Sequence, residues 1–240
     1  MARAFAPTET STAASGDGLG ALLRRPFTAE GIIVSVALAI PFALARWVIP
    51  LGDSLVLMVV SRGLLLIYLG ALASYYFQTV SHIGLGRAGL PFSSADDREA
   101  LVRGGVRGLV CLVVGVGPGI ATSLLVGPPL SVVVLVLGLL LVPASILAIV
   151  MGGNAASGLW PPALASVIAR VPGAYAKLAL VFVLSTVVWG VVMTLVAMSV
   201  GQIPLLGSFV VGATNNVLLL AQALVVGNFL HRHAADLGHT

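Results

Sequence analysis

Arg62 has the strongest potential for chemistry in this sequence, because it lies inside a long apolar stretch. Charged side chains are costly inside a membrane, so they often belong to functional sites there. The nearest acid in the sequence is Asp53, at the outer edge of the same stretch. Two interpretations follow. Arg62 either extends toward the surface and pairs with Asp53 or helix-end carbonyls, which we favour, or it binds an anion in a cavity.

The last apolar stretch carries the second polar group, which consists of Asn215, Asn216 and Gln222. On a helix, Asn215 and Gln222 share one face with Gly212 and Leu219, so this face should point at other helices rather than at lipid. Amides commonly join membrane helices by hydrogen bonds, at about 0.6 kcal/mol each on average. We favour this role over a transport path, since no acidic partner accompanies the amides.

No constellation of residues typical of an enzyme is visible. Asp96 and Asp97 resemble the paired aspartates that bind divalent metals in membrane prenyl-transfer enzymes, but a second acidic cluster is missing. We interpret them, with Ser94, as the capped start of a helix. Cys111 is the single cysteine and cannot form an intramolecular disulfide or a cysteine-based metal site. We therefore expect no enzyme activity, no cofactor and no metal.

The composition indicates a membrane protein. Of the 240 residues, 59% are apolar and 8% are charged, and the mean hydropathy is +1.11. A typical soluble domain has about 25% charged residues. This composition excludes an ordinary soluble enzyme, a disordered protein and a nucleic-acid binder that uses a basic patch. Arg far outnumbers Lys, and Ala, Gly and Val are abundant, which suggests a GC-rich bacterial genome.

Six stretches are long and apolar enough to cross a bilayer as helices. A helix needs about 20 mostly apolar residues to cross about 30 Å of hydrocarbon. Membrane strands would alternate apolar and polar residues, whereas residues 130–142 are apolar apart from Ser131. We predict an all-α polytopic membrane protein with six transmembrane helices, at residues 31–48, 54–77, 103–125, 130–151, 175–200 and 206–230.

The basic residues predict that both termini are cytoplasmic. Six spans place the termini on one side of the membrane, and Lys and Arg near span ends favour the cytoplasm. Ten of the 12 basic residues fall on the side of the termini: Arg3, Arg24, Arg25, Arg87, Arg98, Arg103, Arg107, Arg170, Lys177 and Arg232. We therefore expect a bacterial inner-membrane protein with a mobile cytoplasmic tail at 1–26, a transmembrane domain at 27–232 and a short cytoplasmic tail at 233–240.

Aromatic residues fit this orientation, because rings with a polar edge favour the membrane interfaces. Trp47 falls at the outer interface, while Trp189 lies in mid-span and needs a packing reason. Four other such residues fall at the inner interface: Tyr75, Tyr76, Trp160 and Tyr175.

Prolines and glycines predict the shapes of individual helices. Residues 94–125 should form one long helix, disturbed at Pro118, with further kinks at Pro41 and Pro143. Small residues four apart let helices approach closely. They occur in this helix at Gly104, Gly108, Gly115 and Gly119.

The loop at 152–174 should contain a short helix that lies in the cytoplasmic interface. Pro161-Pro162 favours the start of a helix, and Pro172-Gly173 ends it. This helix either only separates two spans, which we favour, or forms a lid over a cavity.

Three short motifs resemble a family of bacterial multi-pass membrane proteins of unknown function. They are Leu90-Pro91 with Asp96-Asp97, Val171-Pro172-Gly173-Ala174-Tyr175, and residues 230–238. The resemblance implies a six-helix membrane protein and assigns no activity.

We therefore expect a non-enzymatic scaffold or accessory subunit in contact with the lipid bilayer. Its partners would be other copies of the chain or other membrane proteins, reached through small-residue helix faces, and not nucleic acid. The alternative is a small-solute transporter or channel that uses Arg62 and the polar face of the sixth helix. A third hypothesis, an intramembrane enzyme using His82 with Asp96 and Asp97, lacks a second acidic cluster.

Overall fold

The computed structural model describes residues 19–49, 54–87, 89–91 and 98–238. These residues form helices and short connections, with no strand among them, as the sequence predicts for an all-α protein. The expected helix cap at Ser94, Asp96 and Asp97 lies outside the described residues, and so does Asp53.

Five helices of the described chain are long and apolar enough to span a membrane. They are α2 (Ala29–Val48), α3 (Leu55–Gly84), α6 (Pro128–Gly152), α8 (Pro172–Val200) and α9 (Leu206–Arg232).

A bent pair of helices brings this number to six if the pair is one span. It consists of α4 (Arg98–Gly115) and α5 (Gly117–Leu125), which meet at an angle of 43°. The disturbance predicted at Pro118 is therefore confirmed. Gly138 of α6 packs directly on the break, since a Cβ at Gly138 would lie 2.3 Å from the carbonyl oxygen of Gly115.

Helices α3 and α4 pack together almost at backbone contact. A Cβ at Gly104 would lie 2.4 Å from Cα of Ser74, and a Cβ at Gly108 would lie 2.8 Å from Cβ of Ala73. The close approach predicted from the glycine spacing is confirmed, and it occurs within the chain.

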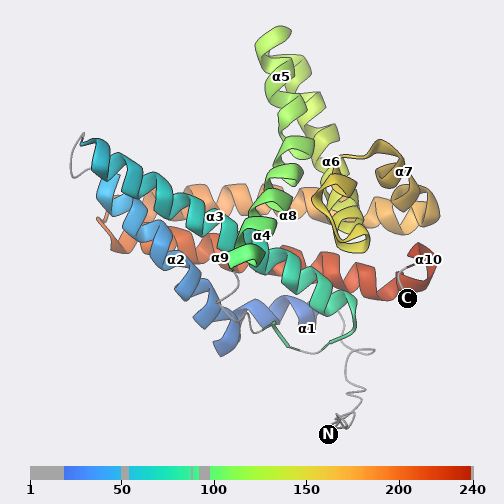
Figure 1. Cartoon of the computed structure of the whole chain (residues 1–240), viewed down its shortest axis with the longest axis horizontal. Coiled ribbons are helices and arrows are strands. Elements are labelled where there is room, and N and C mark those ends of the chain that lie inside the picture. Colours follow the sequence, from blue (N-terminus) through green and yellow to red (C-terminus); the bar gives the residue numbers. More distant parts are fainter. Residues whose placement is uncertain (1–18, 50–53, 88, 92–97, 239–240) are drawn as a thin grey trace, which may run out of the picture.

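Helices α3, α8 and α9 run along the length of the molecule, and α6 meets all three at one end (Figure 1). We call the end that carries the short helices α7 (Pro161–Arg170) and α10 (Ala234–Leu237) the convergent end. The main core lies there, built mostly from the C-terminal halves of α3, α6 and α9 and the N-terminal half of α8. Helix α5 and residues 128–141 of α6, here called the arm, extend away from the other helices (Figure 1).

The arm exposes most of its apolar surface. Leu124 and Leu125 are 81% and 84% exposed, whereas Leu147 and Ile149, at the other end of α6, are fully buried. Large exposed apolar surfaces are rare on soluble monomers, and a lipid environment explains them here. The pattern supports a membrane protein.

The described parts of both terminal segments form short helices that pack on the long ones. Helix α1 (Leu19–Arg24) and the 3₁₀ helix η1 (Arg25–Phe27) precede α2 and pack on α9. At the other terminus, α10 folds back onto the core with Leu237 fully buried. The expected cytoplasmic tails at 1–26 and 233–240 thus contain ordered helices where the structure describes them.

The loop at 152–174 contains the short helix that the sequence predicts. It is α7, preceded by the 3₁₀ helix η3 (Ala155–Gly158). Leu164 and Val167 of α7 are buried in the main core, so this face of α7 packs on protein.

Candidate functional site

A chain of hydrogen bonds joins four helices in the middle of the apolar body. The Nε1 atom of Trp189 (α8) donates to Oδ1 of Asn215 (α9) at 3.0 Å. Nδ2 of Asn215 donates to the hydroxyl of Tyr68 (α3) at 2.7 Å, and this hydroxyl donates to Oδ1 of Asn216 at 2.9 Å. Nδ2 of Asn216 donates to the carbonyl oxygen of Ser35 (α2) at 2.9 Å. We call these five residues the amide network.

The two asparagines reach different helices because consecutive residues of an α-helix are rotated by about 100°. Asn215 therefore faces α8 and α3, while Asn216 faces α2. Tyr68 lies between them and connects both side chains through one oxygen. Asn216 is 2% exposed, so its amide needs partners inside the protein.

Gln222 forms a separate bridge between α9 and α8. Its Nε2 atom donates to Oγ of Ser185 at 3.0 Å and to Oγ1 of Thr186 at 3.1 Å. The predicted amide face of the last span thus contacts neighbouring helices, as expected for residues that join helices.

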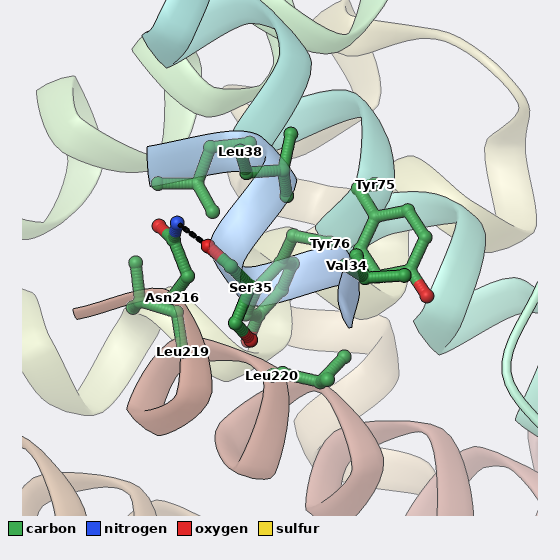
Figure 2. Close-up of a pocket in the computed structure, with 9 residues that line it drawn as sticks. Val34, Ser35, Leu38, Tyr75, Tyr76, Asn216, Leu219 and Leu220 are labelled. Carbon is green, nitrogen blue, oxygen red and sulfur yellow. Dashed lines mark hydrogen bonds between the residues drawn. The ribbon is translucent and has the colours of Figure 1, made fainter. Parts of the chain in front are cut away.

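A small cavity adjoins the amide network between α2, α3 and α9 (Figure 2). Its volume is about 10 Å³, which is close to the least that holds one water molecule. The lining is apolar apart from Ser35, Tyr75, Tyr76 and Asn216. A solute larger than water does not fit this cavity as it stands.

Three residues that line this cavity have hydroxyl groups that are buried without a hydrogen-bond partner among the described residues. These residues are Ser35, Tyr75 and Tyr76. Each buried, unsatisfied polar group costs about 1–3 kcal/mol. Figure 2 shows the Tyr75 hydroxyl pointing away from Ser35 and Asn216. The hydroxyls of Tyr75 and Tyr76 are both enclosed by protein, and the placement of these residues at the inner interface stays a prediction.

Arg62 does not join the amides. Its side chain is exposed on α3, and no hydrogen bond or ion pair joins it to any residue that the structure describes. Its predicted partner Asp53 lies outside those residues. Of the five candidate site residues, the structure therefore brings together Asn215 and Asn216, places Gln222 on a separate bridge, and leaves Arg62 apart.

Two other arginines form hydrogen bonds between segments at the convergent end. Nη2 of Arg107 donates to the carbonyl oxygen of Gly153 at 2.9 Å, and its guanidinium lies 5.9 Å from the centre of the Phe77 ring. Nη1 of Arg170 (α7) donates to the carbonyl oxygen of Leu237 (α10). Both act on carbonyls at the C-terminal ends of helices, where cations are favourable.

Sequence reasoning missed Tyr68, which is the central residue of the amide network. A usable signal was present, because a tyrosine deep in an apolar helix must find a partner for its hydroxyl. The packing reason that Trp189 needs is its hydrogen bond to Asn215.

The described residues contain no group of three or more His, Cys, Asp or Glu side chains placed to hold a metal ion. The chain matches no protein-family model, no curated protein and no solved structure. The resemblance to a family of bacterial membrane proteins therefore stays a prediction from short motifs.

Proposed function

We propose that the chain is a non-enzymatic scaffold or accessory subunit of a bacterial cytoplasmic membrane. The observation that carries this proposal is that the amide side chains of the last span form hydrogen bonds to neighbouring helices. Asn215, Asn216 and Gln222, the polar groups best suited to a transport path, all bond to neighbouring helices. The cavity beside them has room for about one water molecule.

We further propose six spans with both termini in the cytoplasm. Helices α4 and α5 have 18 and 9 residues, which at 1.5 Å per residue give about 40 Å of helix, enough to cross the hydrocarbon as one bent span. The convergent end, with Arg107 and Arg170, then faces the cytoplasm, as the positive-inside rule favours.

In this orientation α7 lies at the cytoplasmic interface. Its apolar face packs on the core, and Ser166 and Arg170 lie off this face. This packing supports a helix that separates two spans and closes the bundle, rather than a lid over a cavity.

Partner contacts are proposed for helix faces that the fold leaves free. The glycines of α4 and α5 predicted for close contacts are used within the chain, on α3 and α6. A Cβ would meet open space at Gly63 of α3 and at Gly190 of α8. These positions, surrounded by exposed apolar side chains, suit a second membrane helix from another subunit.

Site-specific photocrosslinking in the bacterium tests the scaffold proposal. A crosslinking residue replaces Val188 or Val191 beside Gly190, both more than half exposed, and the buried Val80 serves as the control. We expect one defined adduct with a membrane protein that purifies with this chain in a fixed ratio. The adduct partner should lose its assembled state when the chain is deleted.

The Arg62→Leu variant separates the scaffold from the transporter. If the chain is a scaffold, expression of this variant in cells that lack the chain restores the assembled state of the partner. No adduct from the exposed positions, together with solute flux in proteoliposomes that Arg62→Leu abolishes, would reject the scaffold proposal.

The bend between α4 and α5 favours the transporter alternative, because broken helices often line transport sites. In that case Arg62 and the polar face of α9 must meet in another conformation, with Asn215, Asn216 and Gln222 released from their present partners. A disulfide trap between cysteines at 62 and 215 tests this. Its formation in a variant that lacks Cys111 would show that the two faces meet, as the transporter alternative requires.

A further inference from the structure

Among the serine and threonine hydroxyls of the long helices that the structure describes, only that of Ser35 is buried without a hydrogen-bond partner. Serine and threonine inside helices usually donate to a carbonyl of the preceding turn. Seven of them do so here: Ser61, Thr79, Ser131, Ser185, Thr186, Thr194 and Ser199. Oγ of Ser35 makes no such bond, although the residue is 2% exposed. It lines the cavity instead.

The cavity gathers several groups that could share one small ligand. Tyr76 contributes a second buried hydroxyl without a protein partner, and its ring lies behind Ser35 in Figure 2. Asn216 lines the same cavity, and its Nδ2 atom uses one donor on the carbonyl oxygen of Ser35. An amide nitrogen has two donors, so the second remains for a ligand.

We infer that this cavity binds a single water molecule, held by Ser35, Tyr76 and the amide of Asn216. A buried water requires two to four polar partners and about 10–15 Å³ of space, and the cavity supplies both. The ligand is neutral, because the described lining has no charged side chain. The water extends the amide network to the interface between α2 and α3, independently of whether the chain is a scaffold or a transporter.

X-ray radiolytic labelling of the whole chain in nanodiscs of phosphatidylethanolamine and phosphatidylglycerol tests this inference. Hydroxyl radicals formed from a bound water modify adjacent side chains, and tandem mass spectrometry assigns the modified residue. We expect modification of Tyr76 despite its enclosed hydroxyl. Tyr68 is the internal control, because its hydroxyl already donates to Asn216 and accepts from Asn215. Modification of Tyr76 no faster than that of Tyr68 would overturn the inference.

The Ser35→Val variant then assigns the water to this cavity, since it replaces the hydroxyl by methyl groups. We expect the labelling of Tyr76 to be lost. Ser61→Val is the matched control, because Ser61 is also buried but bonds to its own helix, and it should leave the labelling unchanged. Persistent labelling of Tyr76 in folded Ser35→Val would reject the site. If Ser35→Val does not fold, the comparison of Tyr76 with Tyr68 in the unchanged protein still decides.

Discussion

At the scale of single residues, Tyr68 holds the most consequential position. Its one oxygen accepts from Asn215 and donates to Asn216, so two amides on α9 depend on a side chain of α3. These partners lie 147 and 148 residues apart in the sequence, and the fold brings them into contact. Removing this oxygen leaves a donor and an acceptor without partners inside the protein.

We predict that Tyr68→Phe destabilises the protein and Tyr75→Phe does not. Hydrogen bonds between membrane helices contribute about 0.6 kcal/mol on average, so the loss of two should cost about 1 kcal/mol. Tyr75→Phe removes a buried hydroxyl that has no partner among the described residues. Reversible unfolding in mixed micelles measures both. Equal free energies of unfolding for the two variants would contradict the structural role of the network.

Arg62 and Arg107 should respond differently to replacement by leucine. Arg62 is exposed without a described partner, so Arg62→Leu should leave the protein inserted and at normal abundance or better. Arg107→Leu removes a charged hydrogen bond to Gly153 and the contact with Phe77, and should cost about 1 kcal/mol. Quantitative blotting of membranes and the unfolding assay compare them. A strong loss of abundance in Arg62→Leu alone would mean that Arg62 has an essential partner.

At the scale of elements, glycines decide how α4 lies against its neighbours. Gly104 and Gly108 permit the contact with α3, and Gly138 of α6 admits the break at Gly115. Each of these contacts involves backbone or Cβ atoms, which cannot move aside as the end of a flexible side chain can.

We predict that Gly104→Ala disrupts the packing of α4 on α3. The new Cβ would lie 2.4 Å from Cα of Ser74, and overpacking typically costs 1–3 kcal/mol. Gly63→Ala on α3 is the matched control, because a Cβ there meets no atom within 4 Å. Thermal unfolding in detergent measures both variants. Indistinguishable midpoints would show that α3 and α4 do not approach this closely.

Helix α10 gives the second prediction at this scale. Leu237 is fully buried, and Arg170 bonds to its carbonyl oxygen, so we expect the C-terminal segment to stabilise the core. Leu237→Ala should cost about 2 kcal/mol, near the lower end for buried leucine, because a chain end relaxes easily. Leu85→Ala, at a leucine that is 55% exposed, is the control. Unfolding free energies that match in both variants would indicate a tail that is not attached.

At the scale of the whole molecule, the packing density changes from end to end. The convergent end holds the main core, whereas the arm and the C-terminal half of α8 expose apolar side chains such as Leu124 and Met198. Lipid can solvate such surfaces and water cannot, so these exposed apolar side chains imply that a bilayer surrounds them.

We predict that reporters fused after residue 240 and before residue 1 indicate the cytoplasm. Reporters inserted at residue 127 and within 201–204 should indicate the outside. Alkaline phosphatase, active outside, and green fluorescent protein, fluorescent inside, give opposite signals at each site. The insertion at 127 is decisive, because a cytoplasmic signal there would make α4 and α5 a re-entrant pair and leave five spans.

Much of this architecture was predictable from the sequence because hydropathy is a local property. A stretch such as 206–230 must be helical in a membrane, since each backbone group needs a partner within the segment. The helix that contains Pro118 bends for an equally local reason, the missing N–H group. The sequence also indicated that Asn215 and Gln222 face other helices, because amides are unfavourable toward lipid.

Only the tertiary structure decided which groups meet. The rotation of each helix about its axis determines whether Asn216 faces α2 or α8, and this rotation depends on contacts between distant segments. Tyr68 became the centre of the amide network, and Arg62 stayed outside it, because of how α3 packs between α2, α4 and α9. Hydropathy cannot distinguish these faces, since the long helices are apolar on nearly all sides, so their pairing follows from close packing and from the hydrogen bonds between helices.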